Sequence, residues 1–193
     1  AYACLRELLA RHGGRSVVTL EDPIEAELPG VAQTQVHRPA EFTYAVGLRS
    51  LMRQDPDVIL VGEIRDRETA DTTFQASLTG HLVLTTLHAG SAAHGVSRLR
   101  DLGVESYRLR AGLRGVFCQR LLRRCCECQL RTPTPRGCPA CWETGYRGRL
   151  LIAECLLPAR FAIDSQAGST DWTTAPIADL RQLAEAAGLR PLD

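Results

Sequence analysis

Acidic and imidazole side chains follow directly after three short apolar stretches of the sequence. They are Glu21, Asp22 and Glu25 after residues 17–20, Glu63 after residues 58–61, and His88 after residues 81–87. Each apolar stretch is typical of a buried parallel strand. The carboxyl ends of such strands meet at one edge of a sheet, where ligands bind. Neighbouring carboxylates there suit orientation of a water by a general base and indirect binding of Mg²⁺, which favours phosphoryl transfer.

Two arginines, Arg49 and Arg53, are spaced to lie together on one flank of a helix predicted over residues 43–53. They could stabilise the charge of a phosphate group. The ordinary interpretation of such a pair is a solvated helix face that forms weak ion pairs. His81 and His88 likewise have a structural alternative, as core or rim histidines, and Glu63 has one as a solvated turn residue.

The sequence contains two pairs of cysteines at the spacing of metal ligands. Cys125-x-x-Cys128 and Cys138-x-x-Cys141 match the pattern that binds one tetrahedral Zn²⁺. Cys126 lies next to the first pair and leaves the choice of that ligand open. The alternative interpretation is a set of free or redox-active thiols. We expect a structural zinc module.

The elements that must position these residues alternate between strand and helix along the chain. Helical patterns cover residues 1–12, 43–53, 67–78 and 91–102, and Asp66 is a favourable N-cap for the third. This alternation predicts an α/β fold with a mostly parallel sheet and helices on both faces. Less regular stretches are predicted as an edge hairpin or extended loop (28–37), a helical or mixed segment (105–124), a short strand (150–157) and a C-terminal amphipathic helix (177–187). The predicted domains are 1–124, 125–149 and 150–193.

The composition argues against several classes of protein. The 23 basic and 22 acidic residues nearly cancel, which speaks against a nucleic-acid-binding motor and a polybasic membrane patch. No apolar run reaches the roughly 18 residues of a membrane span, and no leader peptide is present, so we expect a soluble cytoplasmic protein. Every basic residue among the 23 is Arg. Met52 is the only methionine, so we expect this chain to lack sequence upstream of Ala1.

Several long motifs, in order, closely resemble the type II secretion and type IV pilus assembly ATPases. They read VVTLEDPIE (17–25), LRSLMRQDPDVILVGEIRD (48–66), SLTGHLVLTTLHA (77–89), FCQRLLRRC (117–125) and GYRGRLLIAE (145–154). The resemblance implies a RecA-like three-layer fold, a small tetracysteine zinc module and a helical C-terminal tail. It also implies ATP, Mg²⁺ and Zn²⁺ as cofactors, a cytoplasmic homo-hexamer, and inner-membrane platform proteins as partners that hold it at the membrane periphery.

The resemblance also implies roles for the candidate site residues. Glu21 and Glu63 would position the attacking water and Mg²⁺, with Asp22 and Glu25 nearby. His81 and His88 would contact the nucleotide and couple it to domain movement. Arg49 and Arg53 would reach phosphates or a neighbouring site, in the manner of arginine fingers. Cys125, Cys128, Cys138 and Cys141 would bind zinc.

The sequence departs from the family pattern in three places. The phosphate-binding motif GxxxxGK[ST] is absent, and the chain contains no Lys that could serve in it. Ala89-Gly90 replaces the usual Thr-Asn after His88, and nine residues separate Cys128 from Cys138, fewer than is common. We therefore expect part of an ATPase that by itself neither binds nor hydrolyses ATP strongly. The stretches SLTGHLV (77–83) and QRLLRRC (119–125) favour type II secretion somewhat over pilus assembly. The alternative is a truncated, nonenzymatic, zinc-containing interaction module of the same machinery.

Overall fold

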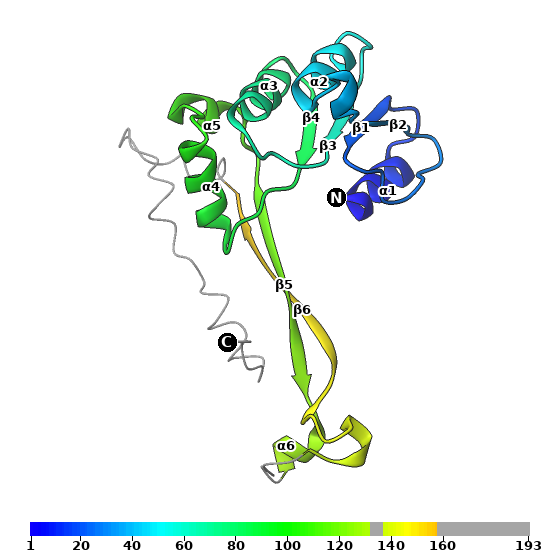
Figure 1. Cartoon of the computed structure of the whole chain (residues 1–193), viewed down its shortest axis with the longest axis vertical. Helices are drawn as coiled ribbons and strands as arrows, with labels where there is room; N and C mark the ends of the chain where they lie inside the picture. Colours follow the sequence, from blue (N-terminus) through cyan, green and yellow to red (C-terminus); the bar gives the residue numbers. More distant parts are fainter. Residues whose placement is uncertain (132–136, 158–193) are drawn as a thin grey trace. The chain divides into compact units, whose positions relative to one another are not determined.

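The computed structural model describes residues 1–131 and 137–157 and divides the chain into two compact units (Figure 1). The first unit contains Ala1–His88 and Gly95–Arg114, and the second contains Ala89–His94 and the described residues 115–131 and 137–157. The C-terminal helix predicted over 177–187 lies outside the described residues. Within the described ranges, no helix combines the length and the apolar character needed to cross a bilayer.

A parallel sheet of four strands forms the centre of the first unit, in the order β2-β1-β3-β4. The strands are β1 (Val17–Glu21), β2 (Ala32–Gln35), β3 (Val58–Val61) and β4 (Leu82–Thr85). The predicted α/β fold with a parallel sheet is confirmed. The stretch 28–37 contains a parallel edge strand, because Ala32–Gln35 pairs with Val18–Glu21 and does not fold back on itself as a hairpin would.

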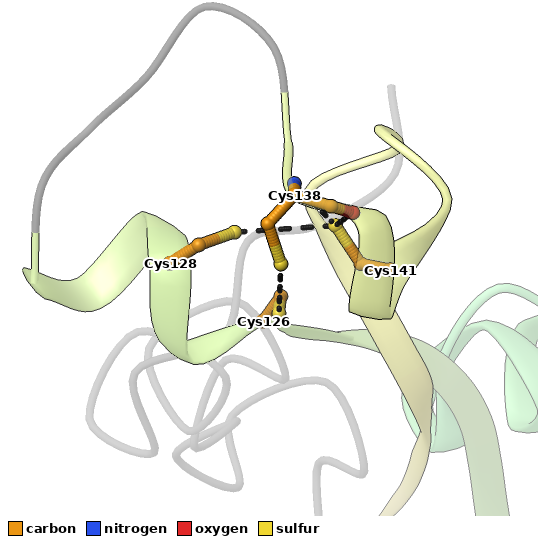
Figure 2. Close-up of side chains that lie close together, drawn as sticks. All are labelled: Cys126, Cys128, Cys138 and Cys141. Atoms are coloured by element: carbon orange, nitrogen blue, oxygen red, sulfur yellow. Dashed lines mark hydrogen bonds between the residues drawn. The ribbon is translucent and has the colours of Figure 1, made fainter.

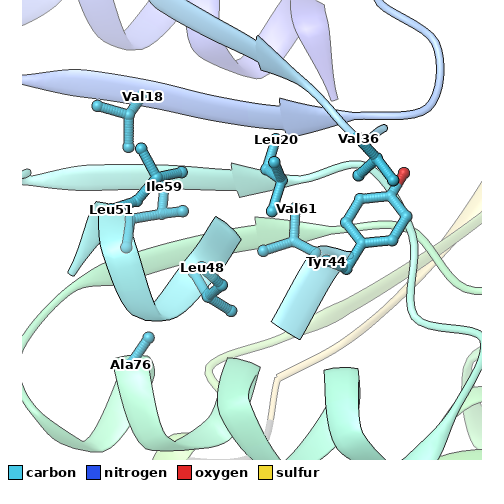
Figure 3. Close-up of a cluster of buried hydrophobic side chains, with 9 residues drawn as sticks. All are labelled: Val18, Leu20, Val36, Tyr44, Leu48, Leu51, Ile59, Val61 and Ala76. Atoms are coloured by element: carbon cyan, nitrogen blue, oxygen red, sulfur yellow. The ribbon is translucent and has the colours of Figure 1, made fainter. Parts of the chain in front are cut away.

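Helices cover both faces of this sheet. Helix α1 (Tyr2–Arg11) packs on one face, where Leu5 meets alternate strand residues. The residues buried with it are Val17, Leu28, Val58 and Leu60. Helices α2 (Tyr44–Leu51) and α3 (Arg67–Leu78) cover the other face through a second core (Figure 3). That core contains Val18, Leu20, Val36, Tyr44, Leu48, Leu51, Ile59, Val61 and Ala76.

The helices begin at capping residues that the sequence supplies. The Thr43 side chain accepts a hydrogen bond from the Val46 N–H at the start of α2, and Asp66 accepts one from the Thr69 N–H at the start of α3, at 2.8 Å. Asp66 is therefore confirmed as the N-cap of α3. Gly47 lets α2 approach the sheet closely, because a Cβ there would lie 2.8 Å from the Leu20 side chain.

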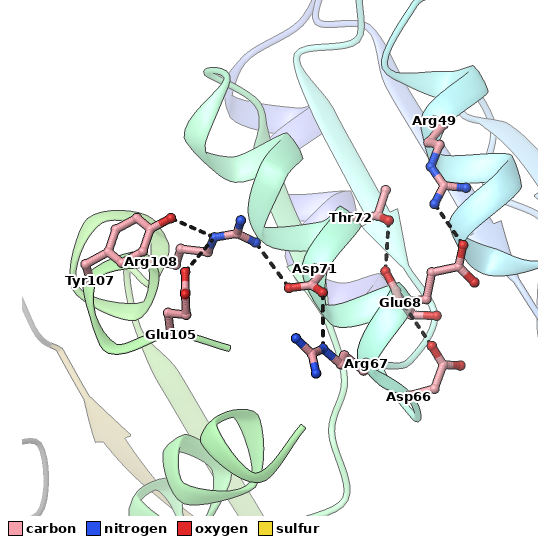
Figure 4. A network of polar contacts seen from close by, with 10 residues as sticks. Arg49, Asp66, Arg67, Glu68, Asp71, Thr72, Glu105, Tyr107 and Arg108 are labelled. Atoms are coloured by element: carbon pink, nitrogen blue, oxygen red, sulfur yellow. Dashed lines mark hydrogen bonds and ion pairs between the residues drawn. The ribbon is translucent and has the colours of Figure 1, made fainter. Parts of the chain in front are cut away.

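Two further helices follow β4: α4 (Ala92–Asp101) and α5 (Ser106–Gly112). Helix α5 packs on α3, where Arg108 Nη1 lies 3.1 Å from Asp71 Oδ1 (Figure 4). Ser77 Oγ of α3 also donates a hydrogen bond to the Gly112 carbonyl. The segment 105–124, predicted as helical or mixed, thus begins with a short helix. Its second part belongs to a strand.

The second unit is built on a long two-stranded antiparallel ribbon. Its strands are β5 (Val116–Cys125) and β6 (Tyr146–Leu156), so the strand predicted at 150–157 begins earlier than expected. One short helix, α6 (Glu127–Arg131), and a 3-10 turn, η2 (Pro139–Cys141), lie at the end of the ribbon where β5 ends and β6 begins. This end carries the cysteines of the predicted zinc module.

Candidate functional site

A cleft of about 430 Å³ lies in the first unit at the carboxyl ends of β1, β3 and β4. Five of the residues singled out from the sequence line it: Glu21, Asp22, Glu25, Glu63 and His88. The remaining lining residues are Ala1, Tyr2, Pro23, Tyr44, Leu60, Gly62 and Thr86. The parallel strands thus bring acidic side chains from separate parts of the sequence to one edge, as the strand pattern predicts. We call this site the acidic cleft.

Glu21, the last residue of β1, is the most enclosed carboxylate of the acidic cleft, with 4% of its surface exposed. Its Oε1 accepts hydrogen bonds from Thr19 Oγ1 at 2.6 Å and from Gln33 Nε2 at 3.0 Å. Its Oε2 accepts one from the Tyr2 hydroxyl. A carboxylate removed from water needs such donors, and here they fix its orientation.

Glu63 follows β3 after a single glycine, and its side chain is 13% exposed. Arg65 forms an ion pair with its Oε1, and His88 Nε2 lies 3.6 Å from its Oε2. That Oε2 is buried and has no hydrogen-bond partner among the described residues. A buried carboxylate oxygen without a donor has capacity for a further ligand, such as a water or a water held by Mg²⁺.

Tyr44 reaches the acidic cleft from the first turn of α2 and is 7% exposed. Its hydroxyl lies so close to the backbone at Gly62 that a Cβ there would be 2.7 Å from it, which explains the glycine before Glu63. Burial, and then the charges of Asp22 and Glu63, raise the pKa of Tyr44 to about 12. The phenol therefore stays protonated and is available as a hydrogen-bond donor at neutral pH.

Four thiols gather at the end of the ribbon in the second unit (Figure 2). The cysteine cluster consists of Cys126, Cys128, Cys138 and Cys141, whose Sγ atoms all lie within 4.8 Å of one another. The Sγ atoms of Cys126 and Cys138 are 3.8 Å apart, and those of Cys128 and Cys141 are 3.9 Å apart. Four sulfurs at such spacing suit the tetrahedral coordination of Zn²⁺.

Cys125, predicted as a ligand, is not a member of the cysteine cluster, and Cys126 takes its place. Cys125 is the last residue of β5 and pairs with Tyr146 across the ribbon, after an irregularity in register between Arg123 and Cys125. The chain leaves the strand at Cys126, whose side chain is buried with the other thiols.

Backbone groups around Cys141 favour its ionised form. Its Sγ accepts hydrogen bonds from the N–H of Cys138 at 3.1 Å and the N–H of Gly145 at 3.3 Å. These contacts, that with Cys138 first, lower the pKa of Cys141 to about 6, whereas burial and the neighbouring thiols raise the pKa of Cys128 to about 12. A Cβ on Gly137 would lie 2.5 Å from the Cys141 Sγ, so the turn requires glycine. A thiolate with N–H donors is the form in which cysteine binds metal.

The sequence matches the family model described as "Type II/IV secretion system protein" over residues 2–187. The chain belongs to this family. It is 46% identical over 195 residues to "Type II secretion system protein HxcR" of Pseudomonas aeruginosa, covering 99% of this chain and 40% of that protein. It is 45% identical over 177 residues to "Type II secretion system ATPase E" of Vibrio cholerae, covering 81% of this chain and 35% of that protein.

Among solved structures, the chain is similar to the pilus retraction motor PilT with bound ADP, at 31% identity and a TM-score of 0.62. The similarity covers 81% of this chain and 43% of that chain. The predicted membership of the secretion and pilus ATPase family is thereby confirmed. The chain spans well under half the length of both curated relatives, at 40% and 35%, so the activity and partners of a whole family member are taken up below as proposals.

Three residues to which the family resemblance assigns nucleotide or phosphate contacts lie outside the acidic cleft of this chain. Arg49 pairs with Glu68 at 2.8 Å where α2 meets α3 (Figure 4), and Arg53 is exposed just beyond α2. His81 precedes β4, at the end of the sheet opposite the acidic cleft, where its Nδ1 lies 3.0 Å from the Ala76 carbonyl oxygen. Of the two histidines, only His88 therefore meets the carboxylates within the described chain.

Four residues that line the acidic cleft or hold its Glu21 carboxylate were not singled out from the sequence as functional. They are the donors to Glu21 (Tyr2, Thr19 and Gln33) and the buried phenol of Tyr44. Thr19 was detectable, because residues two apart on a strand share a face and a threonine there can donate to Glu21. Gln33 and Tyr2 reach Glu21 only through strand pairing and helix packing, which the sequence pattern did not define.

The raised pKa of Tyr44 predicts a loss of stability at alkaline pH. A phenol that ionises near 10.0 in the unfolded chain and near 12 in the fold stabilises the protein fully below pH 10, and this contribution is lost as pH rises through the folded value. The loss is on the order of 2 kcal/mol. The chain has no lysine that titrates in this window.

We therefore expect the free energy of unfolding, measured by urea denaturation from about pH 9.5 to about pH 12, to fall less steeply with pH in Tyr44→Phe than in the wild type. This range covers the pKa of the phenol in the unfolded chain and reaches its pKa in the fold. The matched control is Tyr107→Phe, which removes an exposed phenol on α5. Equal slopes for wild type and Tyr44→Phe would contradict the burial of this hydroxyl in its protonated form.

Proposed function

We propose that this chain contributes the water- and Mg²⁺-positioning part of the ATP site of a secretion motor. The observation that carries the proposal is the pair of enclosed carboxylates, Glu21 and Glu63, at the carboxyl edge of a parallel sheet in a member of this family. Type II protein secretion is the favoured process, with type IV pilus assembly as the second, because both curated relatives named above are type II secretion proteins.

The acidic cleft fits Mg²⁺ better than it fits phosphate. Glu21, Asp22, Glu25 and Glu63 line it, and no arginine is among its lining residues in the described chain. Four carboxylates repel a triphosphate but suit a hydrated divalent cation, and the unpartnered Glu63 Oε2 supplies an acceptor for its water. The phosphate-binding loop GxxxxGK[ST] does not occur in these 193 residues, so they supply one part of the site.

The four carboxylates and the histidine of the acidic cleft have different tasks in this proposal. Glu63 accepts the proton of the attacking water, and His88, 3.6 Å away and 94% exposed, is free to respond to the nucleotide. Glu21 orients the water or the hydrated Mg²⁺, while Asp22 and Glu25 add negative charge at the rim. Bound Mg²⁺ would neutralise charge on the β- and γ-phosphates.

Arg49 on α2 and Arg53 just beyond it do not line this cleft, and both are proposed to act on the site of a neighbouring copy in a homo-hexamer. The motor would be cytoplasmic and peripheral to the inner membrane, and would pass its movements to platform proteins there. His81 is left out of the proposed nucleotide site because it precedes β4 at the opposite end of the sheet.

The cysteine cluster is proposed to bind a structural Zn²⁺ through Cys126, Cys128, Cys138 and Cys141. The support is the donor set itself, four thiols within 4.8 Å together with backbone N–H groups aimed at Cys141. The metal would connect α6 with the turn η2 at the end of the ribbon. Cys126 precedes α6 and Cys128 lies within it, while Cys138 precedes η2 and Cys141 is its last residue.

The test of the proposed function is ATP hydrolysis, measured as phosphate release with Mg²⁺. The protein as its gene encodes it is expected to turn over ATP, and the 193-residue polypeptide alone is expected to show none above background. The second candidate is a nonenzymatic zinc-containing interaction module, because no arginine lines the acidic cleft of the described chain. Absence of ATP turnover by the protein as its gene encodes it would favour this candidate. ATP turnover by the 193-residue polypeptide would contradict the proposal that these residues supply only one part of the ATP site.

A further inference from the structure

The two oxygens of the Glu21 carboxylate are held by different parts of the fold. Oε1 accepts from Thr19 Oγ1 at 2.6 Å and from Gln33 Nε2 at 3.0 Å, and both donors belong to the sheet. Oε2 accepts from the hydroxyl of Tyr2, which belongs to α1. Of these three described donors, Tyr2 is the one that lines the acidic cleft, so Oε2 is the oxygen on the cleft side.

Thr19 and Gln33 form a rigid support because they are direct partners in the pairing of β1 with β2. Neighbouring residues in paired strands share a face of the sheet, and Glu21 lies on that same face two residues beyond Thr19. Strand geometry therefore sets the position of Oε1. Neither donor can leave Oε1 without disturbing the edge of the sheet or rotating its own side chain.

The carboxamide of Gln33 is engaged at both of its polar atoms. Its Nε2 also donates to the Ala26 carbonyl at 3.0 Å, and its Oε1 accepts from the Leu28 N–H at 2.7 Å. The contact with Leu28 fixes which end of the carboxamide is oxygen, because a backbone N–H needs an acceptor. Gln33 thus joins the Glu21 carboxylate to the loop between β1 and β2, which begins at the acidic cleft with Asp22.

We propose that Gln33 is a positioning residue for ATP hydrolysis: it holds Oε1 of Glu21 so that Oε2 faces the attacking water or hydrated Mg²⁺ in the acidic cleft. This inference rests on the proposed function. Gln33 touches neither water nor nucleotide in this role, and it acts through Glu21. Its contacts with Ala26 and Leu28 make the orientation of Glu21 depend on the position of the loop 22–31.

A purely structural role for Gln33 makes different predictions, and a matched variant in the same strand separates the two. Gln35 lies two residues further along β2, and its Oε1 is 3.4 Å from the Ile24 N–H. Gln33→Leu and Gln35→Leu therefore make the same chemical change in one four-residue strand, and only the first removes a contact with Glu21. Thr19→Val removes the other Oε1 donor at nearly constant shape and serves if Gln33→Leu does not fold.

The experiment measures kcat and KM for ATP, and the urea midpoint, in the protein as its gene encodes it. We expect Gln33→Leu to lower kcat about 10-fold or more with KM changed less than about 3-fold, and Gln35→Leu to keep kcat within about 2-fold. In a Glu21→Gln background, Gln33→Leu is expected to lower kcat no further, because the residue it positions is already disabled.

Two results would overturn the positioning role alone: a normal kcat for Gln33→Leu and Thr19→Val with only the urea midpoint lowered, or a full additional loss of kcat in the Glu21→Gln background. Absence of turnover in the wild-type protein would overturn the proposed function and the positioning role together. The wild-type measurement therefore distinguishes the two failures.

Discussion

Replacing Glu63 with Gln is expected to lower kcat for ATP by about 100-fold or more in the protein as its gene encodes it, with little change in KM. The substitution keeps the size of the side chain and removes the carboxylate that is proposed to take the proton of the attacking water. It also leaves His88 and Arg65 facing an uncharged amide in place of their common partner.

The geometry explains why the loss should be large. Glu63 Oε2 is buried and without a hydrogen-bond donor in the described chain, so it is free to accept a proton from a water. A general base that is held in position next to its substrate typically accelerates a reaction about 10²- to 10⁴-fold. Neutralising Glu63 also removes one of the three negative charges, those of Asp22, Glu63 and Glu21, that raise the pKa of Tyr44.

The matched control is Glu105→Gln, the same chemical change at an exposed position before α5, where the carboxylate pairs with Arg108 at 3.6 Å. That variant should keep the kcat of the wild type. Phosphate release under saturating ATP measures both variants, and circular dichroism checks that each is folded. A Glu63→Gln variant with more than about half of the wild-type kcat would rule out Glu63 as the base.

Replacing Cys126 with Ser is expected to abolish stoichiometric zinc binding, whereas replacing Cys125 with Ser is expected to leave it intact. The two cysteines are adjacent in sequence, but only Cys126 is in the cysteine cluster. A hydroxyl is a poor replacement for a thiolate ligand, and a site with three remaining thiols binds the metal more weakly and more openly. Because both variants make the same Cys-to-Ser change at adjacent positions, the pair tests which of the two cysteines is the zinc ligand.

Zinc is measured by atomic emission after dialysis against a weak chelator. The wild type and Cys125→Ser should hold about one equivalent per chain, and Cys126→Ser well below about 0.3. Loss of zinc in Cys125→Ser with retention in Cys126→Ser would restore the ligand set Cys125, Cys128, Cys138 and Cys141 that the sequence spacing favours. Less than about 0.3 equivalents in the wild type would show that the thiols do not form a zinc site.

The elements that carry the acidic cleft were predictable where local pattern decides the structure. Residues 58–61 are apolar on both faces and end at Gly62-Glu63, and the structure has β3 at the same four positions. Asp66 precedes a helical pattern and caps α3. These features depend on neighbours in sequence, so the chain alone defines them.

Features that depend on distant pairing were not predictable in the same way. Strand β2 is half exposed, and its alternation is equally consistent with a hairpin; only its partners in β1 define it. The choice between Cys125 and Cys126 depends on the irregular register near the end of β5, which shifts the chain by one residue. The family resemblance gave His81 and His88 a common role at the nucleotide, yet β4 begins at Leu82 and separates the two histidines to its opposite ends.

The arginine pair illustrates another limit. Arg49 and Arg53 were predicted to share a flank of one helix, but the partner of that flank is not decided by spacing. In the single chain Arg49 is bound to Glu68 from α3. A role of these arginines in the site of a neighbouring copy depends on how the copies assemble. The spacing of two residues in one chain does not say which surface contacts the next copy.

Strand β4, at the edge of the sheet opposite β2, has a consequence for the behaviour of the polypeptide in solution. Within the described residues β4 is hydrogen-bonded to β3 alone, and its apolar sequence Leu82-Val83-Leu84 is partly exposed, Leu82 by 39%. Its outer side therefore presents unpaired backbone N–H and C=O groups, with no charged residue within the strand to repel a second strand. Such an edge is a template for strand addition, either by a correct partner segment or by another molecule in a growing aggregate.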